Sequence, residues 1–528
     1  MRDRLSHYIK NLVLPCFSFA VIAGILSACV IACFQWATGH IVHLSGQLYD
    51  AVRANPVWIP CLIAGAILLG LLSSFILTHS RTCRGGGIPT AVAAIRGIAS
   101  FRWIASVLVL PVSALITFLC GLPLGTEGPC VQMGAAIGDG VVQTLGGKKH
   151  VGWRRYIMTG GAASGFSLAT GAPITAILFS MEELHKHFSP LLFSIASVSV
   201  LAGQMTMRLL ASFGIGSVGL FHIEHFPTTT LKLVLVPLAV GLLCGIGSVL
   251  FTLTYHKIDK LMRTALKKLP RKIKFSAIFA CVALIGFFLS EILGTGHHLI
   301  EHLFEVRSVW YILLIVFFIR AIFMMAANTA GVTGGIFLPT LAFGALIGAI
   351  CAEIFLFAGV IEESQCALIV VLGMTAFLGA TSRIPITACV FAVEALGCIH
   401  NVIFVIVSVA SAFLVVETSG IEDFTDVVVE TKAHDLHAGK EPHSIEVPLT
   451  VCENSFVVGK DLKDILWPAE CVLLSFDRAP ENKGKVGVAA GDVLTVYYTT
   501  YDPASTAEEF EILVGDQAEE IDKIMRPV

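Results

Sequence analysis

The chain has 528 residues, of which 55% are hydrophobic and only 14% are charged, and its formal net charge is −3. Soluble globular domains carry about a quarter of charged residues, so this composition excludes an ordinary soluble protein. The near-neutral charge gives no sign of a nucleic-acid partner, and we expect none. The fifteen cysteines are scattered through apolar stretches, which argues against a disulfide framework.

Long apolar stretches recur through the first four fifths of the chain. A bilayer core of roughly 30 Å needs about 20 apolar residues for each spanning helix. The clearest candidates are residues 11–37, 57–77, 103–124, 155–180, 231–255, 275–292, 309–327, 337–360 and 385–416. Because backbone polar groups cannot stay unpaired in lipid, these stretches predict an all-α polytopic membrane protein. Glycine and proline interrupt several of them, so broken or tilted helices are expected.

The first apolar stretch follows Arg2, Arg4 and Lys10, but no small-residue cleavage site comes after it. We interpret it as a retained helix and not as a signal peptide. These residues and the basic cluster at 257–274 are expected on the cytoplasmic side. The sequence thus predicts cytoplasmic termini in a bacterial-type inner (plasma) membrane.

The composition becomes polar near residue 431. Three runs then alternate apolar and polar residues, at 443–451, 470–476 and 492–498, with turn signals at 481–484 and 491–492. We therefore expect a membrane domain at 1–430 and a small α+β cytoplasmic domain at 431–528.

The membrane part contains an internal repeat. Residues 125–138 (GTEGPCVQMGAAIG) match 335–348 (GIFLPTLAFGALIG), and residues 173–184 (PITAILFSMEEL) match 385–396 (PITACVFAVEAL). Packing between helices favours small residues but does not explain two long motifs in the same order. We expect two inverted halves, approximately 1–215 and 230–430, that meet at a midplane site made of broken helices.

Three segments predict helix starts inside the membrane: 84–89 (RGGGIP), 125–129 (GTEGP) and 334–339 (GGIFLP). The first N–H groups of a helix lack intrahelical acceptors, and the dipole makes this end positive. Three such ends would bind an anion with little formal positive charge. Glu127 at one of them would compete with a diffusible anion and leave when protonated, whereas a purely structural cap is the alternative. Glu182 and Glu183 could pass protons or simply face the cytoplasm.

The segments GGGIP, GTEGP and GGIFLP, in this order and spacing, resemble the three signatures of the CLC family of chloride channels and proton–chloride antiporters. The resemblance covers nearly all of residues 1–431. It implies the CLC fold, with two inverted-topology repeats of broken, tilted helices, and a homodimer with one pore in each subunit. It also implies that Glu127 is the external gating glutamate and Glu183 the internal proton glutamate, with Glu182 beside it.

The same resemblance implies an anion site lined by backbone amides. Its residues come from the three signatures: Gly86, Gly87, Ile88, Gly125, Gly128, Gly335, Ile336 and Phe337. Two positions depart from the family pattern. Gly86 replaces the usual serine of GSGIP, and Phe424 stands at the usual pore tyrosine. The loss of each hydroxyl donor predicts weaker binding, by on the order of 1–3 kcal/mol if nothing replaces it.

The tail stretch IEVPLTVCENSFVVGKDLKDI…GDVLTVYY is similar to the TrkA-C (RCK-C) domain of potassium-transport regulators. This similarity implies a cytoplasmic regulatory module that dimerises or binds a small molecule. It also raises cation conduction as an idea, but the chain has no TVGYG-like filter.

We expect chloride/proton exchange through a membrane, with chloride, protons and lipid as partners, no cofactor and no enzymatic activity. A passive voltage- or pH-gated chloride channel of the same fold is the alternative, and the fluoride branch of the family departs differently in these motifs. A membrane metalloenzyme is a third hypothesis. His298, Glu301 and His302 spell H-x-x-E-H, and His185 and His187 could add ligands.

Overall fold

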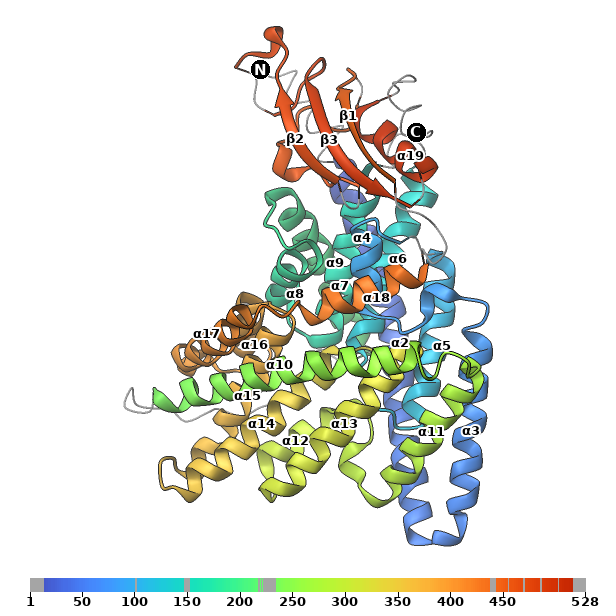
Figure 1. Ribbon diagram of the computed structural model, residues 1–528, viewed down its shortest axis with the longest axis vertical. Coiled ribbons are helices and arrows are strands. Elements are labelled where there is room, and N and C mark those ends of the chain that lie inside the picture. Colours follow the sequence, from blue (N-terminus) through green and yellow to red (C-terminus); the bar gives the residue numbers. More distant parts are fainter. Residues whose placement is uncertain are drawn as a thin grey trace.

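The computed structural model describes residues 14–99, 102–146, 152–216, 219, 221, 234–436, 443–453, 455–468, 471–484, 487–501 and 503–515. This part of the chain is mostly helical, with a small sheet near the C-terminal end (Figure 1). Within it, eight helices are long and apolar enough to cross a membrane. The predicted class, a polytopic α-helical protein followed by a small α+β part, is confirmed.

The helices of the first half are α2 (Leu14–Ala54), α3 (Ile59–Ile76), α4 (Ile88–Ile95), α5 (Trp103–Leu119), α6 (Glu127–Val141), α7 (Arg154–Thr170), α8 (Pro173–Phe179) and α9 (Pro190–Ser212). Those of the second half are α10 (Leu235–Arg263), α11 (Arg271–Phe288), α12 (His297–Glu305), α13 (Trp310–Ala330), α14 (Phe337–Phe357), α15 (Cys366–Thr381), α16 (Pro385–Glu394) and α17 (Val402–Ser419). Helix α18 (Phe424–Leu436) follows and runs across the predicted domain boundary at residue 430.

Two of the predicted spans are each divided into two helices. The stretch 155–180 contains α7 and α8, because Gly171 ends α7 at a positive φ of 73° and Pro173 starts α8. The stretch 385–416 contains α16 and α17. Helices α9 and α15 are absent from the predicted spans. The polar residues of α9 dilute its apolar character, and α15 is only 16 residues long.

Glycines on the repeated motifs hold neighbouring helices at backbone contact. A Cβ atom on Gly134 of α6 would lie 2.1 Å from the carbonyl oxygen of Gly161 of α7. In the second half, a Cβ on Gly344 of α14 would lie 2.4 Å from the carbonyl oxygen of Gly373 of α15. Any larger residue would push these helices apart, so the repeat preserves the same close crossing in both halves.

The second repeated motif is explained by an exchange of helix caps between the halves. The Glu182 carboxylate accepts hydrogen bonds from the amides of Ile386 and Thr387 at the start of α16, at 3.0 and 2.7 Å. Its repeat mate Glu394 accepts from the first amides of α8, at 2.8 and 2.7 Å. Each glutamate therefore accepts hydrogen bonds from the first backbone amides of a short helix in the other half, which have no acceptor within their own helix.

The tail folds around an antiparallel sheet with the order β1-β3-β2, made of β1 (His443–Thr450), β2 (Cys471–Asp477) and β3 (Val493–Thr500). Alternate residues, including Leu494 and Val496, face helix α19 (Pro503–Val514) and its buried Phe510. The three predicted strand runs are confirmed, because their period of two matches the pleat of a half-buried sheet.

Candidate functional site: an anion site at three helix ends

The three predicted helix starts meet in the interior of the protein. Helices α4, α6 and α14 begin next to Gly87, Gly128 and Gly335. A Cβ on Gly128 would lie 2.6 Å from the Cα of Gly335 and 3.1 Å from the Cα of Gly87. Only glycine permits this approach, so these residues bring together the positive ends of three helices.

A pair of backbone hydrogen bonds joins the two halves at this point. The amide of Gly125 donates to the carbonyl of Gly335 at 2.7 Å, and the amide of Gly335 donates back to Gly125 at the same distance. Ile88, Ile336 and Phe337 are buried around the junction. The Phe337 ring packs edge-to-face on Phe166, with centroids 4.9 Å apart.

Glu127 lies at this junction and is fully buried. Its Oε1 atom accepts a hydrogen bond from the Thr126 hydroxyl at 3.0 Å, and its own amide and that of Leu338 stabilise the carboxylate. Its Oε2 atom has no hydrogen-bond partner among the described residues. A carboxyl group of the chain itself therefore lies at the start of α6 and against the start of α14.

In the first signature, the backbone amide of Gly87 has a hydrogen-bond partner within the chain. We expected the Gly87 amide to be free for an anion, but it donates to Oε1 of Gln132 at 2.7 Å. The Gln132 amide group in turn donates to the carbonyl of Thr82 at 3.1 Å. A side chain from α6, buried beside the loop, therefore pairs with this donor, and the anion-binding role of Gly87 stays a prediction. A buried glutamine within GTEGPCVQMG was the available sequence signal.

Two residues of α18 also bear on this region. Phe424 is buried with its ring against Phe251 and Tyr255 of α10, at centroid distances of 5.3 and 4.9 Å. Lys432, which the sequence analysis missed, donates to the carbonyl of Gly85 at 2.7 Å and to the Thr90 hydroxyl at 2.5 Å. Helix α18 thus places an amine side chain on the loop that precedes α4.

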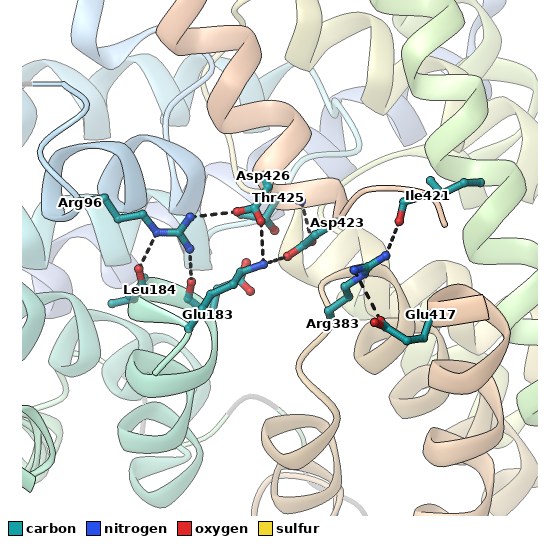
Figure 2. A network of polar contacts seen from close by, with 10 residues as sticks. Arg96, Glu183, Leu184, Arg383, Glu417, Ile421, Asp423, Thr425 and Asp426 are labelled. Atoms are coloured by element: carbon teal, nitrogen blue, oxygen red, sulfur yellow. Dashed lines mark hydrogen bonds and ion pairs between the residues drawn. The ribbon is translucent and has the colours of Figure 1, made fainter. Parts of the chain in front are cut away.

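Glu183 is also buried, and its surroundings are highly charged. Its Oε2 atom has no hydrogen-bond partner in the described part of the chain, while the Thr425 side chain bonds to the carboxylate. Arg96, at the end of α4, donates to the carbonyl of Glu183 and to that of Leu184, both at 2.9 Å. Figure 2 shows these groups meeting beside the start of α18.

Ion pairs connect the same network to α18. Lys186 pairs with Asp423 and, at 2.9 Å, with Asp426, which also accepts from Arg96 at 3.0 Å. Burial raises the pKa of Asp426, but its hydrogen bonds with Lys186 and Arg96 and their charges outweigh this and hold the pKa below its ordinary value. Asp426 therefore stays ionised and anchors α18 to the chain around Glu183.

Among the described residues, the ligand set of the alternative metalloenzyme hypothesis is not brought together. His302 of the H-x-x-E-H motif lines a separate pocket of about 260 Å³ with Glu291 and Arg307. His185 contacts the Thr159 hydroxyl at 2.7 Å, and His187 contacts the carbonyl of His185 at 3.2 Å. The grouping that the structure does bring together contains His297, His298 and Glu301.

Comparison with known proteins is consistent with this geometry. The family model described as a voltage gated chloride channel matches residues 69–417. The H(+)/Cl(-) exchange transporter ClcA of Vibrio cholerae is 27% identical over 419 residues, which cover 76% of this chain and 86% of the relative. A protein of the same name from Salmonella arizonae is 27% identical over 409 residues, covering 75% of this chain and 85% of the relative.

Solved structures show the same fold. A slow cyanobacterial Cl-/H+ antiporter aligns with a TM-score of 0.72 at 21% identity, over 79% of this chain and 98% of that chain. A CLC-type fluoride/proton antiporter aligns with a TM-score of 0.61 at 19% identity, over 77% and 96% of the two chains. With its family match, its fold and its three signatures in place, this chain belongs to the family of voltage-gated chloride channels, the CLC family.

Proposed function

We propose that this protein exchanges chloride for protons across a membrane, with Glu127 as the gate. The observation that carries the proposal is a fully buried carboxyl group at the meeting point of the helix ends, one oxygen of which has no hydrogen-bond partner in the described part of the chain. The curated relatives named as H(+)/Cl(-) exchange transporters support the same reaction.

The chemistry follows from competition for the helix ends. When Glu127 is ionised, the positive N-terminal ends of α6 and α14 attract its carboxylate. The carboxylate then occupies these helix ends and excludes a chloride ion from them. When Glu127 accepts a proton, this attraction weakens, the side chain leaves, and chloride binds to the vacated amides. One side chain thus both accepts the proton and opens the anion path, which couples the two movements.

Glu183 is proposed to provide the inner end of the proton route. It is buried, one of its oxygens has no hydrogen-bond partner among the described residues, and Lys186 and Arg96 lie beside it. Glu182 was predicted to share this role. Since both of its oxygens accept hydrogen bonds from the start of α16, we assign the proton step to Glu183 and a capping role to Glu182.

A passive chloride channel is the second candidate. The specific observation in its favour is that Phe424 lacks a hydroxyl and packs against Phe251 and Tyr255. A site with fewer donors holds chloride less tightly, and weak binding favours leak over strict exchange.

The test is flux from liposomes that contain the purified protein, with chloride release and pH recorded together. In the wild-type protein, we expect a chloride gradient to drive protons across the membrane in the direction opposite to chloride. Glu127→Gln, which keeps the shape but cannot ionise, should abolish proton movement while chloride still flows. Glu183→Gln should also remove proton coupling, and Glu363→Gln on an exposed surface turn is the matched control.

Proton movement that is unchanged in Glu127→Gln would refute the gate. A wild-type reversal potential that ignores the pH gradient would select the channel. Nitrate, bromide and fluoride in place of chloride would then establish the anion selectivity of the site.

The proposal extends to the assembly and its setting. The protein would act without a cofactor, as a homodimer in a bacterial-type inner membrane, with its termini in the cytoplasm and the tail as a TrkA-C-like regulatory domain. Exposed apolar residues on α9 and α17, among them Leu201, Met205 and Leu414, suit contact with lipid or with a second copy. The predicted basic residues Arg2, Arg4 and Lys10 lie outside the described residues.

A further inference from the structure

A cluster of two histidines and a glutamate opens helix α12. The Nδ1 atom of His297 lies 3.1 Å from Oε2 of Glu301, and the Nδ1 atom of His298 lies 3.6 Å from the same oxygen. The three ligand atoms all lie within 4.8 Å of one another. Two ring nitrogens and a carboxylate oxygen are a donor set that Zn²⁺ commonly takes in proteins.

The spacing of these atoms fits a bound metal ion. With metal–ligand bonds of about 2.0–2.1 Å, tetrahedral ligands lie about 3.3 Å apart. The two distances to the Glu301 oxygen, 3.1 and 3.6 Å, lie on either side of that value. A cation between the three atoms would also meet the lone pairs of both imidazoles, which in their neutral form can ligate through Nδ1.

The cluster is open to water. The side chains of His298 and Glu301 are 85% and 43% exposed, and that of His297 is 29% exposed. Figure 1 shows α12 at the end of the molecule opposite to the C-terminal sheet. Three protein ligands with an accessible fourth position describe an exchangeable site that is loaded from the aqueous phase, unlike a closed structural zinc site.

The cluster is also linked to Glu127. His297 is the first residue of α12 and directly follows Gly296. The preceding residue, Gly296, packs against α14, since a Cβ on it would lie 3.0 Å from the Cβ of Ala342 and 3.7 Å from the carbonyl of Leu338. The amide of Leu338 is one of the groups that stabilise Glu127. The start of α12 and the gate therefore share the same end of α14.

We propose that His297, His298 and Glu301 bind a divalent transition-metal ion of the zinc class, and that the bound ion slows transport by holding Glu127 in its closed position. The physical reason is that a divalent charge near the carboxylate favours its ionised form, which occupies the helix ends. The binding site stands on its own geometry, whereas its effect on transport rests on the proposed function of Glu127.

Binding is tested first, with Zn²⁺ and Co²⁺ as probes of the full-length protein in detergent. We expect one ion for each chain by calorimetry and a visible Co²⁺ spectrum with tetrahedral intensity. His298→Ala and Glu301→Ala should each weaken binding by more than about tenfold, the minimum loss seen when even an outer partner of a ligand is removed. His302→Ala, an exposed residue of the same helix outside the cluster, should bind as the wild type does.

Transport is then measured in liposomes with and without zinc on both sides, each variant being normalised to its own zinc-free rate. Zinc should slow chloride flux several-fold in the wild type and in His302→Ala but not in His298→Ala. The absence of stoichiometric binding, or equal binding by His298→Ala and Glu301→Ala, would overturn the site. Stoichiometric binding without any change in flux would overturn the link to Glu127. A wild type with no proton-coupled flux would instead refute the proposed exchange, and the binding measurement would still decide the site.

Discussion

At the scale of single residues, Gly86 shows why a signature can change without losing its shape. A serine side chain at this position requires Leu110 and Gln132 to move, because a Cβ on Gly86 would lie 2.6 Å from Cδ1 of Leu110 and 2.7 Å from Oε1 of Gln132. The Gln132 amide group fills the space and accepts the hydrogen bond of Gly87. A hydroxyl that would have faced an anion is thus replaced by a side chain that ties the loop to α6.

Replacing Gly86 with the family's serine should therefore lower both the stability of the protein and its chloride flux. Gly86→Ser is expected to destabilise it by about 1–3 kcal/mol through overpacking, seen as a lower unfolding midpoint in detergent and a smaller chloride flux. Gly86→Ser combined with Gln132→Ala should recover part of both, because the shorter side chain vacates the site. Gly39→Ser in α2 is the control, since nothing lies within 4 Å of a Cβ there. An equally stable Gly86→Ser single variant would contradict this account.

At the scale of helices, the exchanged caps explain why the second motif is repeated: each copy stabilises a short helix of the other half. Short helices such as α8 and α16 have little stability of their own, and their first amides have no intrahelical acceptors. Glu182 and Glu394 supply those acceptors from the opposite half, and each also accepts from a threonine hydroxyl at 2.7 Å. The two halves of the membrane part are thereby joined by paired, charge-assisted bonds.

The caps allow the roles of Glu182 and Glu183 to be separated. Glu182→Ala and Glu394→Ala should each cost about 1–2 kcal/mol of stability, as the loss of a helix cap does. Because Glu394 has no acidic neighbour at residue 395, it is the matched control for Glu182. If Glu182 only caps, both variants will retain the wild-type ratio of protons to chloride in liposomes. A lower ratio in Glu182→Ala alone would restore its predicted part in proton transfer.

At the scale of the whole molecule, the tail is docked on the ends of α7 and α9. Arg155 pairs with Glu509 at 2.6 Å and donates to the carbonyl of Trp467 at 2.7 Å. The Tyr156 hydroxyl and the Ser189 hydroxyl both donate to Asp464, to its carbonyl and its carboxylate respectively. Helix α7 also supplies Gly161 and Gly165, which pack on α6. The tail is therefore one helix away from the helix that begins at Glu127.

A weaker contact between the tail and α7 should be measurable by hydrogen exchange of the tail. Arg155→Ala should weaken docking by on the order of 1 kcal/mol, which corresponds to roughly fivefold faster hydrogen exchange around residues 462–467. Glu509→Ala should have a similar effect, and the double variant should add little to either. Lys463→Ala, an exposed residue of the tail, is the control. Exchange that stays at the wild-type rate in Arg155→Ala would show that the tail does not depend on this pair.

Much of the architecture could be predicted from local sequence. Glycine and proline at 84–89, 125–129 and 334–339 predicted the starts of α4, α6 and α14, because these residues limit which backbone conformations and donors are available. The alternation in the tail predicted all three strands. The spans around 171–173 and 394–402 were predicted as continuous because hydropathy does not register a break between two apolar helices.

By itself the sequence determined the helical class, the three glycine- and proline-marked helix starts, the internal repeat, and the carboxylate at one of those starts, since these properties depend on residues close together in the chain. Tertiary structure alone decided what each group touches. Gln132 reaches Gly87 across 45 positions and Glu182 reaches Ile386 across 204, so neither contact leaves a local pattern. The same holds for the surroundings of Glu127: the residues at the start of α6 predicted a donor-rich helix end, but only folding brought Gly87, Gly128 and Gly335 into contact, because that meeting requires both halves of the chain at once.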